Sequence, residues 1–417
     1  MVKNLLIVNQ PMRNRGDESA HKALIRMLLN RFTDINIEVL VCKGFYNEMD
    51  IEEFKLLHPK VNYVMEPIKP EKAFWYLVKR GIYQPCFKFF WMFHPGIVRF
   101  IKHYLHVDLI ICAPGGICMG GFQNWEHLFL LHIAKLLNKP IAYFGRSIGP
   151  FPERTLSNRN FKKGSIYLLK YMGFISLRDQ KSFDLCKSLG YKCELTADTA
   201  FLDQPRTNLP DVFKEKICNK KYLIMVPNLL IWHYAFKNKL TRDNMVGFFS
   251  KLADVLFEEY PNHRILLLPQ TFGHKNDENI QNDIHFFREI KDLNKNENLI
   301  VVDDKYSSDI QQSIIANAEF LTGARYHSIV FAINNNIPFV ALSYEHKIEG
   351  LLEILNKKDC MIDISGDRLG DTANLDSLLE EFRIKVKCAT KDEFSQKEAK
   401  RIVSEGADKF LNYSMSL

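Results

Sequence analysis

The 417-residue sequence lacks several features that mark specialised classes of protein. No stretch approaches the roughly 18 uninterrupted apolar residues of a membrane-spanning helix, because charged residues and proline interrupt even the richest apolar region. Polybasic tails are also absent, since the 56 Lys and Arg residues that give a formal net charge of +7 are spread along the chain. These absences exclude a membrane-spanning protein and a dedicated duplex-binding protein, and we expect no nucleic-acid partner.

The nine cysteines contain no CxxC pair, and several lie within apolar, strand-like runs. An odd number of cysteines without this pairing favours a reducing compartment, and the spacing of His and Cys predicts no zinc site. The N-terminus has only a short apolar run and no small-residue cleavage site, which argues against a secretory signal. We therefore expect a cytoplasmic protein.

Short apolar, β-branched runs alternate with amphipathic segments, which is the pattern of a parallel α/β sheet. A first array has expected strands at 5–8, 37–42, 109–112, 141–144 and 174–177, with helices at 19–32 and 127–137. A second array has expected strands at 222–226, 264–268, 299–302, 320–323 and 339–342, with helices at 244–259, 309–317 and 328–334. Two such arrays, in a chain longer than the roughly 250–300 residues that one core supports, predict an α/β protein of two Rossmann-like domains facing across a cleft.

The domain boundaries follow from where the strand rhythm pauses. We expect an N-terminal domain at 1–205, a polar linker with prolines at 206–221, a C-terminal domain at 222–390 and a C-terminal helix at 391–417. The last helix is expected to pack on the first domain. Because ligands of such sheets bind at the carboxyl ends of the strands, functional residues should follow the strand runs.

One segment, 72–106, interrupts the first array. It is rich in aromatic and basic residues and contains no Asp or Glu. This composition is typical of an interfacial membrane segment, which would dock the protein at the inner face of a membrane. The alternative is that the aromatics belong to the core of the first domain and the lysines to its solvated rim.

The turn after the first expected strand, 9–19, is the first candidate site. Gly16 lies between Arg15 and Asp17 at the head of a helix, where backbone N–H groups can hold an anion or a sugar hydroxyl. Asp17 and Glu18 equally suit a purely structural role, since carboxylates stabilise a helix N-terminus.

Two further candidates follow expected strands of the first array. The segment 113–121 carries the paired glycines Gly115 and Gly116, which would let a ligand approach the main chain, although loop geometry alone also explains them. The segment 145–150, GRSIGP, presents Arg146, which we expect to face the cleft.

Arg178 ends the last expected strand of the first array, and Asp179 is positioned to begin a helix. An arginine at a strand end can grip a carboxylate or phosphate with two parallel hydrogen bonds. The structural alternative is an ion pair of Arg178 with Asp179 or Asp198.

The most informative candidate is GARYHS at 323–328, which follows a strand of the second array. Arg325 and His327 alternate there along what we expect to be one extended segment, so that both side chains would project to the same side and meet one ligand. Lys347 would add a third positive group. A structural histidine is the alternative.

In this order and spacing, the motifs resemble those of the polysaccharide pyruvyltransferase family over about residues 4–355. The motifs are NRGDE at 14–18, the glycine turn at 115–116, SIGP at 147–150, LRD at 177–179, Ala-Asp-x-Ala at 197–200, and GARYHSIVFAI at 323–333 followed by Pro338, Tyr344, Lys347 and Gly350. The sequence departs from the family pattern at Arg146, where glutamine is common, and at Thr199, where proline is common.

The resemblance implies a GT-B-like enzyme that moves a pyruvyl group from phosphoenolpyruvate onto two hydroxyls of one sugar, forming a cyclic ketal and releasing phosphate. It implies that Arg325 and His327 hold the donor and act on it, and it maps the family's first-domain arginine onto Arg178. It requires no cofactor and no metal. If 72–106 docks on a membrane, the acceptor is a lipid-linked sugar.

The chemistry of this reaction agrees with the candidate residues. Phosphoenolpyruvate carries roughly three negative charges, which a pocket lined by arginine and lysine would balance. The expected donor-site cations are Arg178, Arg325, Lys347 and Arg146, with His327 as the imidazolium that protonates C3. The expected base is Asp17 or Glu18 on the facing domain, with Asp198 second. The expected acceptor-binding residues are Asn14, Gly16, Gly115, Gly116 and Asp198.

Two other functions remain open from the sequence. A GT-B glycosyltransferase with a nucleotide-sugar donor would also use a basic cleft and a histidine. A catalytically silent, sugar-binding member of the same pathway would retain Arg325 and His327 for structural reasons only.

Overall fold

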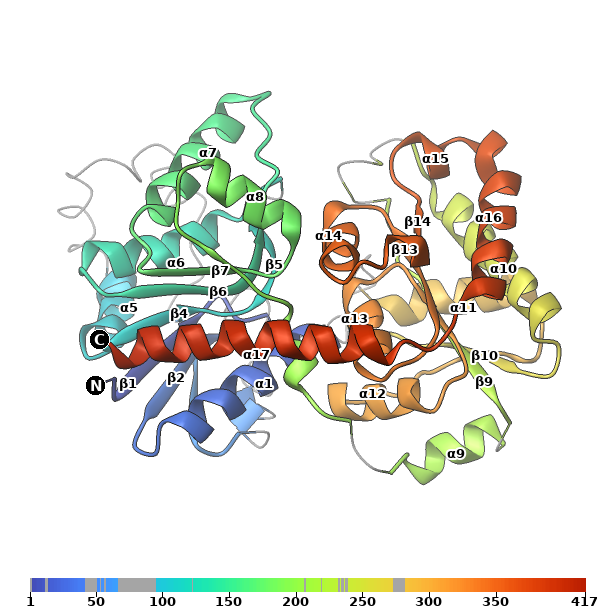
Figure 1. The fold of residues 1–417 in the computed structure, drawn as a ribbon, viewed down its shortest axis with the longest axis horizontal. Helices are drawn as coiled ribbons and strands as arrows, with labels where there is room; N and C mark the ends of the chain where they lie inside the picture. The colour runs from blue at the N-terminus through green and yellow to red at the C-terminus, as the bar shows by residue number, and fades with distance from the viewer. Residues whose placement is uncertain are drawn as a thin grey trace. The chain divides into compact units, whose positions relative to one another are not determined.

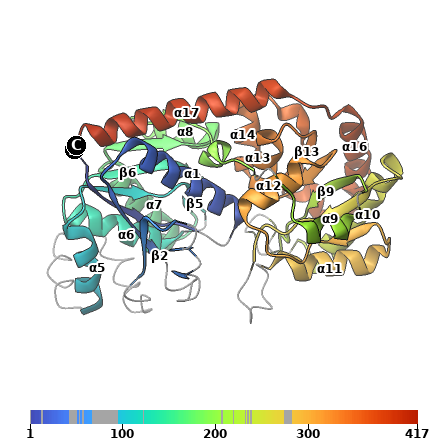
Figure 2. The same ribbon diagram turned by 90° about the horizontal axis from the view of Figure 1, so that it is seen from below.

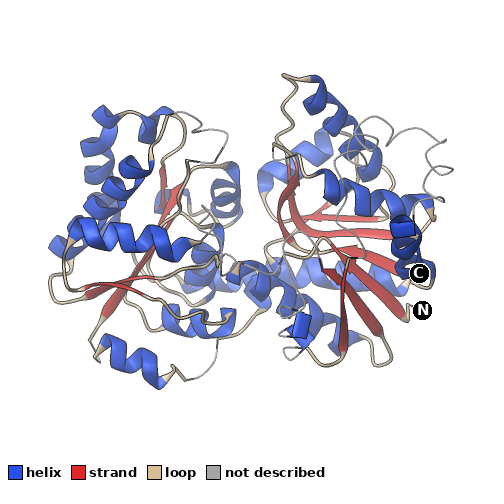
Figure 3. Ribbon diagram, turned by 180° about the vertical axis from the view of Figure 1, so that it is seen from behind, coloured by secondary structure: helices blue, strands red, loops and turns tan. Residues whose placement is uncertain are grey.

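The computed structural model describes residues 2–11, 14–41, 51–52, 54–55, 58–66, 95–121, 123–205, 208–218, 220–231, 233, 236, 239–272 and 282–417. The chain forms two compact units. Unit 1 comprises Met1–Pro11, His21–Thr199 and Ile402–Leu417, and unit 2 comprises Met12–Ala20 and Ala200–Arg401. Figure 3 shows that each unit contains its own sheet, with helices against both faces.

Two segments of the chain do not belong to the unit that their position in the sequence suggests. Met12–Ala20 groups with unit 2, although it lies near the N-terminus, and Ile402–Leu417 groups with unit 1. Helix α1 (Arg15–Arg31) therefore begins in unit 2 and continues in unit 1 from His21. The expected linker, 206–221, contains helix α9 (Asp211–Ile217), which belongs to unit 2.

Unit 1 is built on a parallel sheet in the order β3-β2-β1-β4-β6-β7-β8, with β5 paired to β6. Its strands are β1 (Asn4–Val8), β2 (Asn36–Val41), β3 (Val61–Met65), β4 (Leu109–Cys112), β5 (Gly115–Met119), β6 (Ile141–Ile148), β7 (Phe174–Leu177) and β8 (Glu194–Leu195). Its helices, besides part of α1, are α5 (Pro95–Leu105), α6 (Trp125–Leu136), α7 (Leu156–Leu169) and α8 (Gln180–Ser188). All four residues of β4 are buried, as expected for a central strand of a sheet covered on both faces.

The long helix α17 (Glu393–Met415) contributes its last residues to unit 1. In Figures 1 and 2 this part of α17 and helix α1 lie on one face of the sheet, and α5, α6 and α7 lie on the other. The ring of Phe410 stacks on that of Phe144 with 4.5 Å between their centroids, and Tyr413 stacks on Phe174 at 5.6 Å. Aromatic packing thus fixes the end of the helix on strands β6 and β7.

Helix α5 is the part of the aromatic and basic segment 72–106 that the structure describes. Its Phe100 and Tyr104 are buried in the core of unit 1, whereas Arg99 is exposed. For these two aromatics the core interpretation holds. Residues 72–94 lie outside the described residues.

Unit 2 is built on a parallel sheet in the order β11-β10-β9-β12-β13-β14. Its strands are β9 (Tyr222–Val226), β10 (Arg264–Leu267), β11 (Leu299–Val301), β12 (Leu321–Gly323), β13 (Phe339–Ser343) and β14 (Met361–Asp363). Its remaining helices are α10 (Arg242–Glu259), α11 (Asp283–Asn294), α12 (Ser308–Ala316), α13 (Tyr326–Asn334), α14 (His346–Ile354), α15 (Asp367–Gly370) and α16 (Leu375–Cys388), with 3-10 turns at Thr199–Leu202, Lys358–Cys360 and Thr372–Asn374. Helices α10, α11 and α16 share one apolar core with the sheet.

Within the described ranges, no helix combines the length and the apolar character needed to cross a membrane.

Candidate functional site

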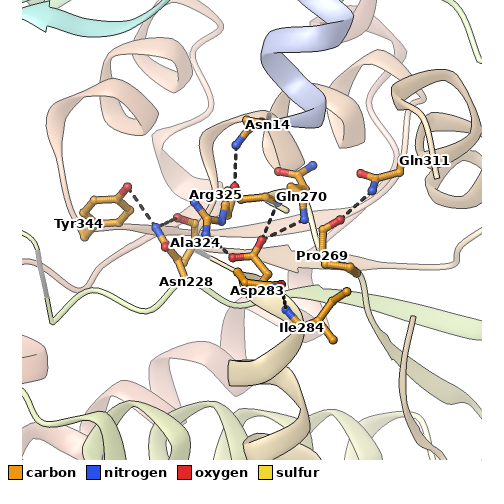
Figure 4. A network of polar contacts seen from close by, with 12 residues as sticks. Asn14, Asn228, Pro269, Gln270, Asp283, Ile284, Gln311, Ala324, Arg325 and Tyr344 are labelled. Carbon is orange, nitrogen blue, oxygen red and sulfur yellow. Dashed lines mark hydrogen bonds and ion pairs between the residues drawn. The ribbon is translucent and has the colours of Figure 1, made fainter. Parts of the chain in front are cut away.

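The candidate site lies in unit 2, where four neighbouring strands end. Strands β10, β9, β12 and β13 are adjacent in the sheet, and Gln270, Asn228, Arg325 and Glu345 follow their carboxyl ends in that order. In parallel α/β sheets this edge is where ligands bind. Figure 4 shows Gln270, Asn228 and Arg325 together with their polar contacts.

Arg325 is held by a carboxylate of the same unit. Its Nη2 forms an ion pair with Oδ1 of Asp283, the first residue of helix α11. The second oxygen, Oδ2, accepts the backbone N–H groups of Gln270 at 3.0 Å and Thr271 at 2.9 Å. Asp283 is therefore fixed on both sides, and it fixes the guanidinium in turn. The Arg325 side chain is 15% exposed, so the guanidinium remains accessible.

His327 does not lie on an extended segment, and the prediction of strand-like alternation with Arg325 is wrong. Strand β12 ends at Gly323, Arg325 is the N-cap of helix α13, and His327 lies in the first turn of that helix. The reason is local, because Ser328 N–H and its hydroxyl both donate to the carbonyl of Arg325, at 3.0 and 2.6 Å, and close a helical turn.

The segment that begins with Asn14 contacts this site from the N-terminal end of the chain. The amide of Asn14 donates to Oγ1 of Thr271 at 3.2 Å, and the backbone N–H of Arg15 donates to the carbonyl of Gln270 at 2.9 Å. These contacts lie within unit 2. The NRGDE motif is thus built into the same unit as Arg325 and His327, which corrects the expectation that it faces them from the first domain.

Gly16 lies directly against the imidazole of His327. A Cβ atom added to Gly16 would overlap the Cβ, Cγ and Nδ1 atoms of that histidine. Only glycine fits at this position without a steric clash, and its backbone packs against the His327 ring. Ligand binding by this turn stays a prediction, and the structure adds a packing contact between Gly16 and His327.

Glu18 is occupied by structural partners. It is 2% exposed, its Oε1 accepts from N–H and Oγ of Ser308 at 3.1 and 3.2 Å, and its Oε2 pairs with Arg15 at 2.5 Å. Ser308 is the first residue of helix α12, so Glu18 stabilises the N-terminus of that helix. Asp17, the other candidate base, is partly exposed.

Lys347 has its own carboxylate partner at the start of helix α14. Its Nζ lies 2.5 Å from Oε1 of Glu345, whose other oxygen lies 3.6 Å from Nε2 of His233. Burial acts to raise the pKa of Glu345, but Lys347 and His233 outweigh it and lower that pKa to about 2. Glu345 is therefore ionised at any physiological pH, and Lys347 is fixed beside it.

Asn228 and Tyr344 form a buried pair behind Arg325. The Asn228 amide donates to the Tyr344 hydroxyl at 3.2 Å and to the carbonyl of Ala324 at 3.5 Å. Burial, and then the nearby Glu345, raise the pKa of Tyr344, so the hydroxyl stays protonated.

Arg178 and Asp198 form a closed ion pair in unit 1. Their side chains are 1% and 0% exposed, and Arg178 also donates from Nε to the hydroxyl of Ser147 at 3.2 Å. Asp179 caps helix α8 by accepting from N–H and Oγ of Ser182, both at 2.8 Å, as expected for a residue that begins a helix. The ion pair of Arg178 with Asp198, which the structural alternative predicts, is therefore present.

Arg146 is buried in unit 1 and bonded to main-chain carbonyls. Its guanidinium donates to Asn9 at 3.0 Å, Ala113 at 2.6 Å and Gly116 at 3.2 Å, and the side chain is 1% exposed. It does not face solvent, which corrects that expectation.

The paired glycines next to Arg146 lie in strand β5 rather than in a free loop. Gly115 has a φ of +155° and lies beside the Arg146 guanidinium, whereas a Cβ on Gly116 would contact nothing. Only Gly115 thus has a structural reason to be glycine.

Three of the four cations expected to balance the donor already have carboxylate partners, and the fourth, Arg146, is held by carbonyls. Two of the carboxylate-paired cations, Arg325 and Lys347, lie in unit 2, and each ion pair there adds no net charge. Among the described residues, no group of three His, Cys, Asp or Glu side chains could hold a metal ion.

Four residues of this site carry no recognisable sequence motif: Asn228, Gln270, Asp283 and Glu345. Gln270 and Asn228 follow strands β10 and β9, so the rule that functional residues follow strands could have found them. Asp283 has no local signal, because it is the first residue of helix α11 and lies beyond residues 273–281.

Comparison with known proteins adds a family and a fold. The model of the polysaccharide pyruvyl transferase family matches residues 14–346. The amylovoran biosynthesis protein AmsJ of Erwinia amylovora is 22% identical over 390 residues, which cover 87% of this chain and 88% of AmsJ.

Solved structures of similar fold span the whole chain. The UDP-GlcNAc 2-epimerase of Neisseria meningitidis bound to UDP-GlcNAc superposes with a TM-score of 0.57 at 12% identity and covers all of both chains. Anabaena Alr3699/HepE in complex with UDP and glucose gives a TM-score of 0.56, also at 12% identity and full coverage of both chains. At such identity the likeness concerns fold alone, and it confirms the predicted GT-B-like fold of two Rossmann-like domains.

Proposed function

The chain belongs to the polysaccharide pyruvyl transferase family, and from that premise we propose that it transfers a pyruvyl group from phosphoenolpyruvate to two hydroxyls of one sugar during polysaccharide biosynthesis. The observation that carries the proposal is the placement of Arg325 and His327 at the strand edge of unit 2, with Gly16 of the NRGDE motif against the histidine ring. Similarity to AmsJ, named for amylovoran biosynthesis, supports the polysaccharide context.

In the proposed reaction His327 acts as general acid. A proton from its imidazolium adds to C3 of phosphoenolpyruvate, and the positive charge that develops at C2 is shared with the bridging phosphate oxygen. A first sugar hydroxyl bonds to C2 and gives its proton to a base. The bond between C2 and the phosphate oxygen then breaks, and the second hydroxyl closes the ketal while its proton leaves with phosphate.

Arg325 is the proposed anion-binding group for the donor. Asp283 pairs with one nitrogen of its guanidinium and thereby fixes the plane of that group. The remaining N–H groups of the guanidinium then point in fixed directions. Preorganised donors of this kind stabilise developing charge without having to reorient during the reaction. Lys347, fixed by Glu345, supplies a second oriented cation.

Asp17 is the proposed base for the sugar hydroxyl. Glu18 is already engaged with Ser308 and Arg15, whereas Asp17 is partly exposed and adjoins Gly16. Arg178, Asp198 and Arg146 have no part in this proposal, because all three are buried with structural partners in unit 1.

The test is a direct assay. The purified protein is incubated with phosphoenolpyruvate and a panel of simple and carrier-linked glycosides, and phosphate release is followed together with the product mass. We expect equal amounts of phosphate and of a glycoside heavier by one pyruvyl ketal. Turnover of a nucleotide sugar with nucleotide release would favour the glycosyltransferase alternative, and no turnover of any donor would favour a catalytically silent sugar-binding protein.

Within this proposal the acceptor is a sugar on a lipid carrier at the inner membrane face. The acid-free, aromatic and basic composition of 72–106 supports it, since such segments bind anionic interfaces. Co-sedimentation with anionic vesicles tests it, with a variant in which Trp75, Trp91 and Phe93 are replaced by Ser. Equal amounts of both proteins in the supernatant would contradict membrane docking.

A further inference from the structure

The carboxamide of Gln270 is buried in the candidate site without a hydrogen bond. Gln270 is 0% exposed, and neither its Nε2 nor its Oε1 has a partner. The backbone of the same residue is fully engaged, because its N–H donates to Asp283 and its carbonyl accepts from Arg15. Figure 4 shows this side chain without a dashed contact, pointing away from Asp283 and toward the side on which Asn14 lies.

A buried amide without partners destabilises the unliganded protein, because it has lost its hydrogen bonds to water and gained none in return. A buried group of this kind in a native structure calls for an explanation, and a bound ligand is one. The Nε of Arg325 is a second buried nitrogen donor without a partner at the same place, since Arg325 and the Gln270 backbone share the carboxylate of Asp283. Two unmatched N–H donors therefore belong to residues that are held by one fixed carboxylate.

We propose that the Gln270 side chain binds an oxyanion of the anionic donor together with Arg325. The inference rests on the proposed function and adds a substrate-binding residue to it. Nε2 of Gln270 donates to a carboxylate or phosphate oxygen, and the guanidinium of Arg325 donates to the same group. Such charge-assisted hydrogen bonds are stronger than those between neutral partners.

The charge of the site explains why a neutral amide is useful here. Arg325 and Lys347 are already paired with Asp283 and Glu345, so neither pair supplies net positive charge to a multiply charged donor. A carboxamide adds a hydrogen-bond donor without a counterion to displace.

A second buried glutamine of unit 2 shows what a structural amide looks like. Nε2 of Gln312 donates to Asp203 at 3.1 Å and to Ser19 at 3.4 Å, and its Oε1 accepts from Asn334 at 2.8 Å. Gln312 is also 0% exposed, but both of its polar atoms are bonded. It is the matched control for Gln270.

The experiment compares Gln270→Met with Gln312→Met, because methionine keeps the length of the side chain and removes the amide. For Gln270→Met we expect an unchanged or higher melting temperature and a KM for phosphoenolpyruvate raised about 10-fold to 100-fold, the range for losing a hydrogen bond to a charged group. For Gln312→Met we expect a lower melting temperature and an unchanged KM.

The outcomes separate this inference from the proposed function. Wild-type protein that never consumes phosphoenolpyruvate would overturn both. Wild-type protein that turns over the donor, beside a Gln270→Met variant of equal KM, would overturn the inference alone, whether or not kcat or stability had changed. A raised KM supports it at any melting temperature, because KM does not depend on the fraction of folded enzyme.

Discussion

Each unit of the molecule places an arginine directly after a strand or one residue beyond it and pairs it with a carboxylate, but the two pairs are built differently. Arg178 and Asp198 of unit 1 are 1% and 0% exposed, and Ser147 accepts a further hydrogen bond from the arginine. Arg325 of unit 2 is 15% exposed, and its Nε has no partner. The first pair is enclosed, and the second leaves donors for a ligand.

The difference lies in what surrounds each pair. The unit 1 pair joins Arg178, at the end of β7, to Asp198, and Nε of Arg178 donates to Ser147 of β6. The Asp283 carboxylate of the unit 2 pair also accepts the backbone N–H of Gln270, whose side-chain amide has no partner. An arginine at a strand end therefore signals a binding site only when its surroundings leave polar groups unmatched.

The largest expected effect comes from breaking the enclosed pair. Asp198→Asn leaves the Arg178 charge buried without a counterion, and we expect the free energy of unfolding to fall by about 3–5 kcal/mol. Asp283→Asn should cost less, because Asn retains an oxygen for the N–H groups of Gln270 and Thr271, and it should instead raise the KM for phosphoenolpyruvate. Urea denaturation and steady-state kinetics of both variants measure the two effects.

Equal behaviour of the two variants would contradict the distinction between an enclosed pair and a ligand-binding pair. An Asp198→Asn protein of normal stability with a raised KM would place the unit 1 pair in the donor site. Replacing both members of the pair, as Arg178→Met with Asp198→Leu, should recover much of the lost stability, since no uncompensated charge then remains.

The next largest effect is on catalysis by His327. His327→Ala should lower kcat by about 100-fold or more, the usual contribution of a general acid, with little change in stability. His21 of unit 1 is the matched control, because both of its ring nitrogens are bonded, to Gln10 at 2.9 Å and to Tyr63 at 2.8 Å. Burial, and then the nearby His58, lower the pKa of His21, so that it is neutral.

His21→Ala should therefore lower the melting temperature and leave kcat per folded molecule unchanged. Activity measured against the concentration of folded enzyme separates the two histidines. If His327→Ala retained wild-type kcat, the histidine of GARYHS would be structural, and the general acid would have to be sought elsewhere.

The sequence predicted ten strands of the two sheets, most of which are largely buried apolar runs, and it missed β3, β5, β8 and β14. The runs at 109–112 and 222–226 correspond to β4 and β9, in which every residue is buried. Side-chain partners were much harder to predict. Arg178 and Arg325 follow similar strand ends, and only the three-dimensional structure shows that Arg178 is enclosed and that Arg325 is partly exposed.

The role of Gly16 shows the same limit. The motif NRGDE predicted a ligand-binding turn, since a glycine at a helix head exposes backbone N–H groups. Its steric partner, His327, lies more than 300 residues away in the sequence, and no local pattern reveals that contact. Residues that act through long-range packing leave no trace in the spacing of one sequence.

Gly16→Ala should have an intermediate effect on catalysis. The new methyl group must displace the His327 ring, and we expect kcat to fall by about 10-fold to 100-fold, as for other small misplacements of a reacting group. In a His327→Gly background the same change should cost no further activity and little stability, because both the ring and the Cβ that it would strike are gone. A loss of equal size in both backgrounds would mean that Gly16 acts independently of His327.

The smallest expected effect concerns an ion pair of unit 2 that is more exposed. Lys357 and Asp392 lie 2.6 Å apart with 26% of each side chain exposed, and Asp392 also accepts from the Ser395 hydroxyl at 2.7 Å. Burial acts to raise the pKa of Asp392, but the hydrogen bonds from Lys357 and Ser395 outweigh it and lower that pKa from 3.8 to about 2. A lowered pKa in the folded state means that this stabilisation is present above pH 3.8 and is lost as the pH falls toward 2.

Asp392→Asn should therefore reduce the free energy of unfolding by only about 0.2–1 kcal/mol near neutral pH, as for other accessible pairs, and the difference from wild type should shrink between pH 4 and pH 2. Urea denaturation of both proteins across this range measures it. The KM for phosphoenolpyruvate should not change, because neither residue belongs to the candidate site. A raised KM would show that partial exposure is enough to make an ion pair part of the donor site.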